Sequence, residues 1–100
     1  MNNNKKITWD EVRKSLELTP EEEALVQLEM DIIQATIDAR KKNSLTQREL
    51  SKKSGLKQSV IARIESRARS PKVETLIKML IPMGYTLRVM PIDKNFMKNK

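Results

Sequence analysis

Residues 45–65, LTQRELSKKSGLKQSVIARIE, decide the fold of this chain. Thr46 opens a Thr-x-x-Glu capping box, in which the Thr hydroxyl accepts from the backbone N–H three residues on and the Glu side chain reaches back. The helix that begins there is expected to end at Gly55, because glycine readily takes the positive φ found just after a helix C-terminus. A second short helix follows over about residues 58–66. Its first turn is polar, so it is expected to face something outside the protein.

A long helix is predicted before this stretch, over about residues 19–42. It starts at a second capping box, Thr19-Pro-Glu-Glu, with Pro20 at the first helical position. Two apolar stripes run along different sides of it. They are Leu25, Leu28, Ile32, Ala35 and Ala39, and Val26, Met30, Ile33 and Ile37. This face is wider than one small domain usually buries, so either a terminal segment folds back over it or a partner covers it.

The remaining elements are shorter. A third capping box, at Thr8, predicts a short N-terminal helix, and an amphipathic pattern predicts a last helix over residues 73–80, before Pro82 and Gly84. Residues 85–90, YTLRVM, alternate with period two, which predicts a strand. A lone strand leaves both edges unpaired. The alternatives are pairing with another chain and addition to the chain's own fold.

Composition limits the class of protein. The chain of 100 residues is 38% hydrophobic with 3% aromatic residues, which suits one small helical domain. It has no Cys and no His, so disulfides, Cys/His metal sites and His acid–base chemistry are excluded. No secretory signal or membrane span is visible, and a soluble cytoplasmic protein without cofactor or metal is expected.

Residues 1–38 carry four Lys/Arg and nine Asp/Glu, whereas residues 39–100 carry sixteen Lys/Arg and four Asp/Glu. The basic part is typical of a nucleic-acid binder.

Two short helices joined at a glycine turn, with Lys and Arg around a polar second helix, form a helix-turn-helix. Residues 45–80 resemble the Xre/Cro-type repressor domain through matching positions at Leu50, Gly55, Ile61, Glu65, Pro71, Thr75 and Leu76. The match covers about residues 30–84. The wider layout resembles the HigA-type antitoxins, with an ITWDEV segment, a Pro-Glu-Glu helix start and a YTLRVMPI segment.

The resemblance implies a mainly all-α fold of four to five helices with a single C-terminal β-strand. Residues 1–18 would be an N-terminal arm with a short helix, and residues 19–84 the helix-turn-helix domain. Residues 85–92 would be a strand for intermolecular pairing, and residues 93–100 a disordered tail. The implied function is that of an antitoxin, which neutralises a HigB/RelE-like mRNA-cleaving toxin by direct binding. It would also repress its own operon, as a homodimer on a palindromic double-stranded operator.

The family's site residues carry over by position. Gln58, Ser59 and Arg63 match positions that reach base edges, and the chemistry agrees because Gln pairs well with adenine and Arg with guanine. An ion pair between Arg40 and Glu65 is implied as a structural tie between the long helix and the end of the second short helix. Contacts to DNA phosphates are expected from six further residues: Thr46, Gln47, Lys57, Arg67, Arg69 and Lys72.

Lys57 and Lys72 depart from the family pattern, which often has Ser or Thr at these two helix starts. A lysine cannot accept a hydrogen bond, so each start forgoes about 1 kcal/mol of capping. A phosphate held by the lysine and the free backbone N–H groups would offset that loss. The hypothesis is that both helix starts are fully capped only on DNA.

Two apolar sets are interpreted as protein contacts. Trp9, Val12 and Leu16 are assigned to a toxin-docking helix, the alternative being packing against the second stripe of the long helix. Tyr85, Leu87 and Val89 are assigned to dimerisation through the predicted strand, or to pairing with the toxin's sheet.

Competing functions are a free-standing Xre-type regulator and a protein-binding module whose DNA face is vestigial. An enzyme is not expected. The acidic run at residues 21–23 complements the positive end of the helix dipole, and the basic half has no spare carboxylate cluster.

Overall fold

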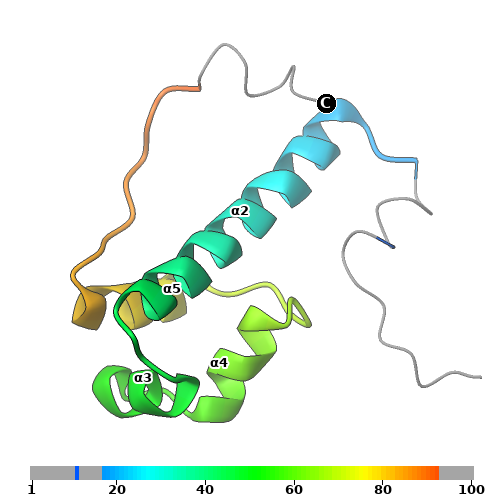
Figure 1. Cartoon of the computed structure of the whole chain (residues 1–100). Coiled ribbons are helices and arrows are strands. Elements are labelled where there is room, and N and C mark those ends of the chain that lie inside the picture. Colours follow the sequence, from blue (N-terminus) through cyan, green and yellow to red (C-terminus); the bar gives the residue numbers. More distant parts are fainter. Residues whose placement is uncertain (1–10, 12–16, 93–100) are drawn as a thin grey trace, which may run out of the picture.

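The computed structural model describes Glu11 and residues 17–92, and the fold in this part is helical (Figure 1). Its elements are α2 Pro20–Lys42, α3 Gln47–Ser54, α4 Gln58–Glu65, α5 Val73–Leu80 and the 3₁₀ helix η1 Ile81–Met83. The four predicted helices in this part of the chain are confirmed to within a residue or two. Trp9, Val12 and Leu16, with the N-terminal helix predicted around them, lie outside the described residues.

The start and the end of α2 follow from local sequence. At the start, the Glu22 N–H donates to Thr19 Oγ1 at 3.1 Å, and the Thr19 N–H donates to Glu22 Oε1 at 2.9 Å. This is the complete capping box that the sequence predicted. At the end, Ser44 takes a φ of 57° and its N–H donates to the Lys41 carbonyl at 2.9 Å. The chain can therefore turn directly into α3.

The turn between α3 and α4 is held by short polar side chains. A second complete capping box starts α3 at Thr46, and Gly55 ends it with a φ of 79°. The Ser51 hydroxyl donates to the Leu56 carbonyl at 2.5 Å, and the Leu56 N–H donates to Ser54 Oγ at 3.2 Å. These bonds satisfy both backbone polar groups of Leu56, directly after the glycine, and hold the turn that joins α3 to α4.

The core lies where the C-terminal half of α2 meets α3, α4, α5 and η1. Its buried apolar side chains are Ile33, Ile37, Ala39, Leu50, Ile61, Ile64, Leu76, Met79, Leu80 and Met83. The N-terminal half of α2 extends beyond this body (Figure 1), and none of its residues before Ile33 is buried. None of the helices in the described part is long and apolar enough to cross a membrane.

The predicted strand over residues 85–92 is wrong for the single chain. This segment runs as extended chain without a strand (Figure 1), and the part of the chain that the structure describes contains no other strand. An isolated extended segment has no ladder, because its backbone groups need a neighbouring strand. Leu87 is half-buried against the core, whereas Tyr85 and Val89 are exposed, Val89 completely.

Candidate nucleic-acid interface

The two faces of α4 differ sharply in burial. Ile61 and Ile64 are 0% and 1% exposed and hold the inner face in the core. Gln58, Ser59 and Arg63 are all exposed on the outside. The three side chains predicted to read bases therefore lie on the accessible outer face of α4, Gln58 and Ser59 in its first turn and Arg63 in its last turn.

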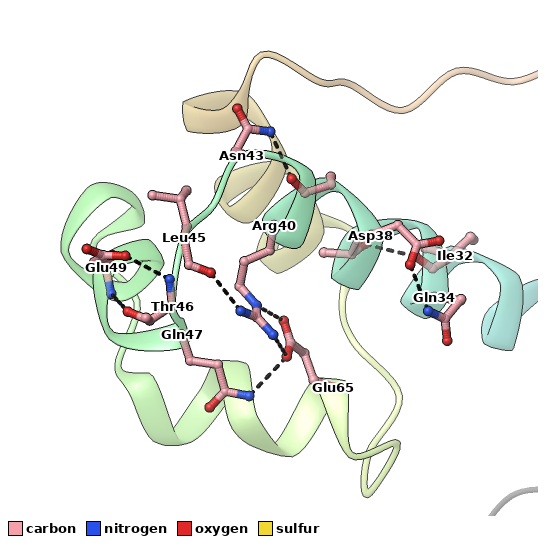
Figure 2. A network of polar contacts seen from close by, with 12 residues as sticks. Ile32, Gln34, Asp38, Arg40, Asn43, Leu45, Thr46, Gln47, Glu49 and Glu65 are labelled. Carbon is pink, nitrogen blue, oxygen red and sulfur yellow. Dashed lines mark hydrogen bonds and ion pairs between the residues drawn. The ribbon is translucent and has the colours of Figure 1, made fainter.

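A buried ion pair holds the C-terminal end of α4 (Figure 2). Arg40 Nε lies 2.7 Å from Glu65 Oε2, and Arg40 Nη2 donates to Glu65 Oε1 at 2.9 Å. The two side chains are only 12% and 7% exposed. Arg40 Nη1 also donates to the Leu45 carbonyl at 2.7 Å. The predicted pair is thus a two-bond contact of the strong, geometrically specific kind, and it joins α2 to α4.

Gln47 enters the same network from α3. Its Nε2 donates to Glu65 Oε1 at 3.0 Å, and the side chain is half-buried (Figure 2). Thr46 Oγ1 accepts from the Glu49 N–H at 3.0 Å. Both residues therefore make intramolecular bonds here, and their assignment to phosphate contacts stays a prediction. Through Gln47, Glu65 ties α4 to α3 as well as to α2.

The N-termini of α4 and α5 have no side-chain cap. Lys57 and Lys72 occupy the two N-cap positions, each with extended backbone and no side-chain hydrogen bond to its helix. Both lysines are exposed. The first backbone N–H groups of a helix have no partner within the helix, so both ends offer donors and a cation to an approaching anion.

The loop between α4 and α5 is fixed to α2. Arg67 takes a φ of 62°, and its Nη2 donates to Gln34 Oε1 on α2 at 2.8 Å. The Ser70 hydroxyl donates to Glu29 Oε2 on α2 at 2.6 Å. Arg67, which the sequence assigned to phosphate, is thus half-buried and turned toward α2.

Arg69 in the same loop is exposed, and with Arg63 it lines an open hollow beside the end of α4. Gln34 and Glu29, which position this loop, could not be identified from the sequence. They lie 33 and 41 residues from their partners, and no local pattern marks contacts at such a distance.

The segment that contains α3, α4 and α5 carries a strong excess of positive charge. Residues 40–92 contain thirteen Lys/Arg and three Asp/Glu. One of the three carboxylates, Glu65, is neutralised in the buried network. Among the described residues, no group of three or more Asp or Glu side chains is placed to hold a metal ion. The arrangement suits electrostatic contact with a polyanion.

Comparison with known proteins agrees with this geometry. The model of the family described as "Helix-turn-helix" matches residues 37–90. The chain belongs to the helix-turn-helix family. Within this helix-turn-helix, α3 and α4 are the two helices of the motif, and their turn is the one at Gly55.

Two relatives extend the comparison beyond the helix-turn-helix itself. An uncharacterised HTH-type transcriptional regulator of Haemophilus influenzae is 36% identical over 84 residues, which are 84% of this chain and 85% of that protein. A solved structure described as a toxin–antitoxin module from Streptococcus pneumoniae superposes with a TM-score of 0.62 at 35% identity. The match covers 91% of this chain and all of that chain.

Proposed function

We propose that this protein is a HigA-type antitoxin that binds its own operator and a HigB/RelE-like toxin. The observation that carries the proposal is the geometry of α4. Its inner face is buried and its C-terminal end is fixed by Glu65, while Gln58, Ser59 and Arg63 are exposed on its outer face. A helix held in this way presents a rigid polar rim to a ligand outside the molecule.

The chemistry of the rim favours the major groove of double-stranded DNA. The groove admits a helix end, Gln can bond adenine N6 and N7, and Arg can bond guanine O6 and N7. Lys57 and Lys72 at the starts of α4 and α5, and Arg69 in the loop between these helices, are exposed cations, which suit phosphate contacts. A homodimer would place two copies of α4 on half-sites about 34 Å apart or a multiple of that distance.

The antitoxin role rests on similarity along nearly the whole chain. The match to the Streptococcus pneumoniae toxin–antitoxin module covers 91% of the chain at 35% identity, well beyond the residues 37–90 of the family model. The part outside that model includes most of α2 and the N-terminal arm with Trp9, Val12 and Leu16. We therefore assign toxin binding to the N-terminal part of the chain and DNA binding to the basic part.

DNA binding is tested with the protein's own promoter fragment and a scrambled fragment of equal length. We expect tighter binding to the promoter, with affinity that falls steeply as salt is raised, because Lys and Arg release counterions from phosphates. Equal affinity for both fragments at every salt concentration would contradict the proposed operator.

Toxin binding is tested with the product of the adjacent reading frame, co-expressed with the full chain. We expect a basic protein of similar size that co-purifies in a stable complex. Deletion of residues 1–18 should release it if Trp9, Val12 and Leu16 carry the contact. A complex that survives the deletion would assign the contact to α2 or to the C-terminal segment.

Dimerisation is assigned to the extended segment with Tyr85, Leu87 and Val89, which gains a ladder only from another chain. Val89 is fully exposed in the single chain, so Val89→Asp should leave monomer stability unchanged. We expect this variant to lower the molar mass measured by light scattering from that of a dimer to that of a monomer. An unchanged mass would remove the segment from the interface.

The second candidate is a free-standing Xre-type repressor, favoured by the 36% identity to a protein described only as a transcriptional regulator. It shares the DNA-binding prediction and lacks the toxin. Absence of any partner encoded next to this chain would favour it.

A further inference from the structure

An apolar strip on α2 is left uncovered by the domain core. We call the strip formed by Leu25, Leu28, Ile32 and Ala35 the apolar track. Leu25 and Leu28 are 60% and 45% exposed, Ala35 is exposed and Ile32 is half-buried. Residues three and four apart lie on one side of a helix, so these side chains form one continuous line. The other apolar stripe of α2, by contrast, enters the core through Ile33 and Ile37.

The track ends in a cavity of about 160 Å³ between α2 and the start of the C-terminal segment. Its lining is mostly apolar and consists of Ile32, Ala35, Thr36, Leu80, Tyr85, Thr86 and Leu87. The Thr36 hydroxyl already donates a hydrogen bond to the Ile32 carbonyl at 2.8 Å, so it does not require a polar group from a ligand. An apolar cavity of about 150 Å³ accommodates a molecule the size of benzene. The cavity can therefore receive one large apolar side chain.

The surroundings of the track are acidic. Residues 17–39 contain seven Asp/Glu and no Lys or Arg. With 3.6 residues per turn, Glu29 and Asp31 lie about 80° from the track on opposite sides of it. DNA would be repelled by this half of α2. A protein with Lys and Arg around a protruding apolar side chain would be complementary to it in both charge and shape.

We infer that the apolar track and its cavity form the docking surface for a basic partner protein, which inserts an apolar side chain into the cavity. The inference rests on the proposed function, because it names the part of the antitoxin that the basic toxin contacts. It also moves the main contact from the N-terminal arm, where Trp9, Val12 and Leu16 lie, to α2.

Two other occupants fit the surface less well. A second copy of α2 would bring two acidic helices together, and juxtaposed like charges are costly in an interface. Residues 1–18 of the same chain carry four Lys/Arg against three Asp/Glu, so they bring little net charge to a helix this acidic. A basic protein with an apolar side chain at its surface would cover the exposed leucines and would also complement the charge of the seven carboxylates.

The test uses the product of the adjacent reading frame and full-length variants of this chain, with affinity measured by calorimetry. Leu25→Ser with Leu28→Ser should weaken binding about tenfold for each leucine, or about 100-fold together. The matched control is Val73→Ser with Ile81→Ser, which removes two apolar side chains of 64% and 62% exposure that lie outside α2 and do not line the cavity. This control should bind the partner as the wild type does.

Two further variants separate the contribution of the cavity to binding from the contribution of the acidic charge. Ala35→Trp places a bulky side chain at the mouth of the cavity from an exposed helical position and should weaken binding about tenfold. Asp31→Lys should slow association and reduce its salt dependence, because exposed charges act mainly on encounter. Unchanged affinity for Ala35→Trp would exclude insertion into the cavity.

The outcomes distinguish the two proposals. If the wild-type chain fails to bind the product, both the antitoxin role and the docking surface are wrong. If the product binds equally to the wild type and to the Leu25/Leu28 variant, only the docking surface is wrong. Promoter affinity of that variant must equal that of the wild type, since a fall would indicate damage to the domain.

The same variant tests the other occupants. Conversion of a dimer to a monomer by Leu25→Ser with Leu28→Ser would show that a second copy covers the track. An equal, non-additive fall in unfolding temperature for this variant and for deletion of residues 1–18 would show that the chain's own arm covers it. Either result would overturn the inference.

Discussion

The two ends of α4 are built in opposite ways. At the C-terminal end, Glu65 is 7% exposed and accepts hydrogen bonds from Arg40 and Gln47. At the N-terminal end, Lys57 makes no side-chain cap, and Gln58 and Ser59 are exposed. At the C-terminal end the polar side chains find hydrogen-bond partners within the molecule. At the N-terminal end the first backbone N–H groups have no partner within the helix.

This contrast separates stability from recognition along a helix of only 8 residues. The buried network restrains α4 relative to α2 and α3, while the exposed end contributes little to folding and is available to a ligand. Substitutions at the two ends should therefore affect different measurements. Those in the Glu65 hydrogen-bond network should change the free energy of unfolding, and those on the exposed face, at Gln58, Ser59 and Arg63, should change DNA binding.

The largest effect is expected at Glu65. Glu65→Ala leaves the Arg40 guanidinium buried without its carboxylate, and breaking such a pair costs about 3–5 kcal/mol. Urea denaturation followed by circular dichroism measures the loss. The matched control is Glu74→Ala, since Glu74 pairs with Lys78 at 3.4 Å on the surface with both side chains more than half exposed. That pair should contribute about 0.3–0.5 kcal/mol, and similar losses at both sites would refute the contrast.

The next effect concerns DNA discrimination. Gln58→Ala and Arg63→Ala should each cost about 1–3 kcal/mol on the promoter and relax sequence preference, because each removes a base contact. Arg69→Ala should weaken promoter and random DNA alike, since a phosphate contact carries no sequence information. Fluorescence anisotropy with both DNAs measures the ratio. An equal loss on both DNAs for all three variants would refute these assignments.

A smaller effect is expected at a satisfied helix start. Thr46→Ala removes the hydroxyl that accepts from the Glu49 N–H at 3.0 Å and should lower the free energy of unfolding by about 1 kcal/mol. Thermal unfolding measures it. Thr46→Ser, which retains the hydroxyl, is the control and should be close to the wild type.

The smallest effect is expected at the two unsatisfied starts, and it has the opposite sign. Lys57→Ser and Lys72→Ser supply a cap and should each raise the free energy of unfolding by up to about 1 kcal/mol. Each should also weaken DNA binding, because the lysine and the free N–H groups no longer hold a phosphate. Greater stability with unchanged DNA affinity would show that these ends are not phosphate sites.

The helices could be predicted because their boundaries are local. Thr19 and Thr46 form capping boxes within four residues, and Gly55 takes the positive φ that ends α3. The strand could not be decided in this way. Residues 85–90 alternate as a strand does, yet a ladder depends on a partner strand that the described part of the chain does not supply.

The site was predictable in part for the same reason. Exposure of Gln58, Ser59 and Arg63 follows from the helical period once Ile61 and Ile64 are placed inside. The contact between Arg67 and Gln34 joins residues 33 apart in sequence. This contact depends on how the loop crosses α2. The sequence alone therefore does not distinguish Arg67 from the other cations of the basic loop.

The length of α2 has a consequence for how two ligands would influence each other. Leu25 and Arg40 are separated by about 22 Å along the helix axis at 1.5 Å per residue. This distance exceeds two Debye lengths at physiological ionic strength, where one length is about 8 Å. Charges that a ligand brings to the Leu25 end of α2 are thus largely screened from a duplex at α4. Coupling between that end and α4 would have to pass mechanically, along α2 and through the bonds that Ser70 donates to Glu29 and Arg67 donates to Gln34.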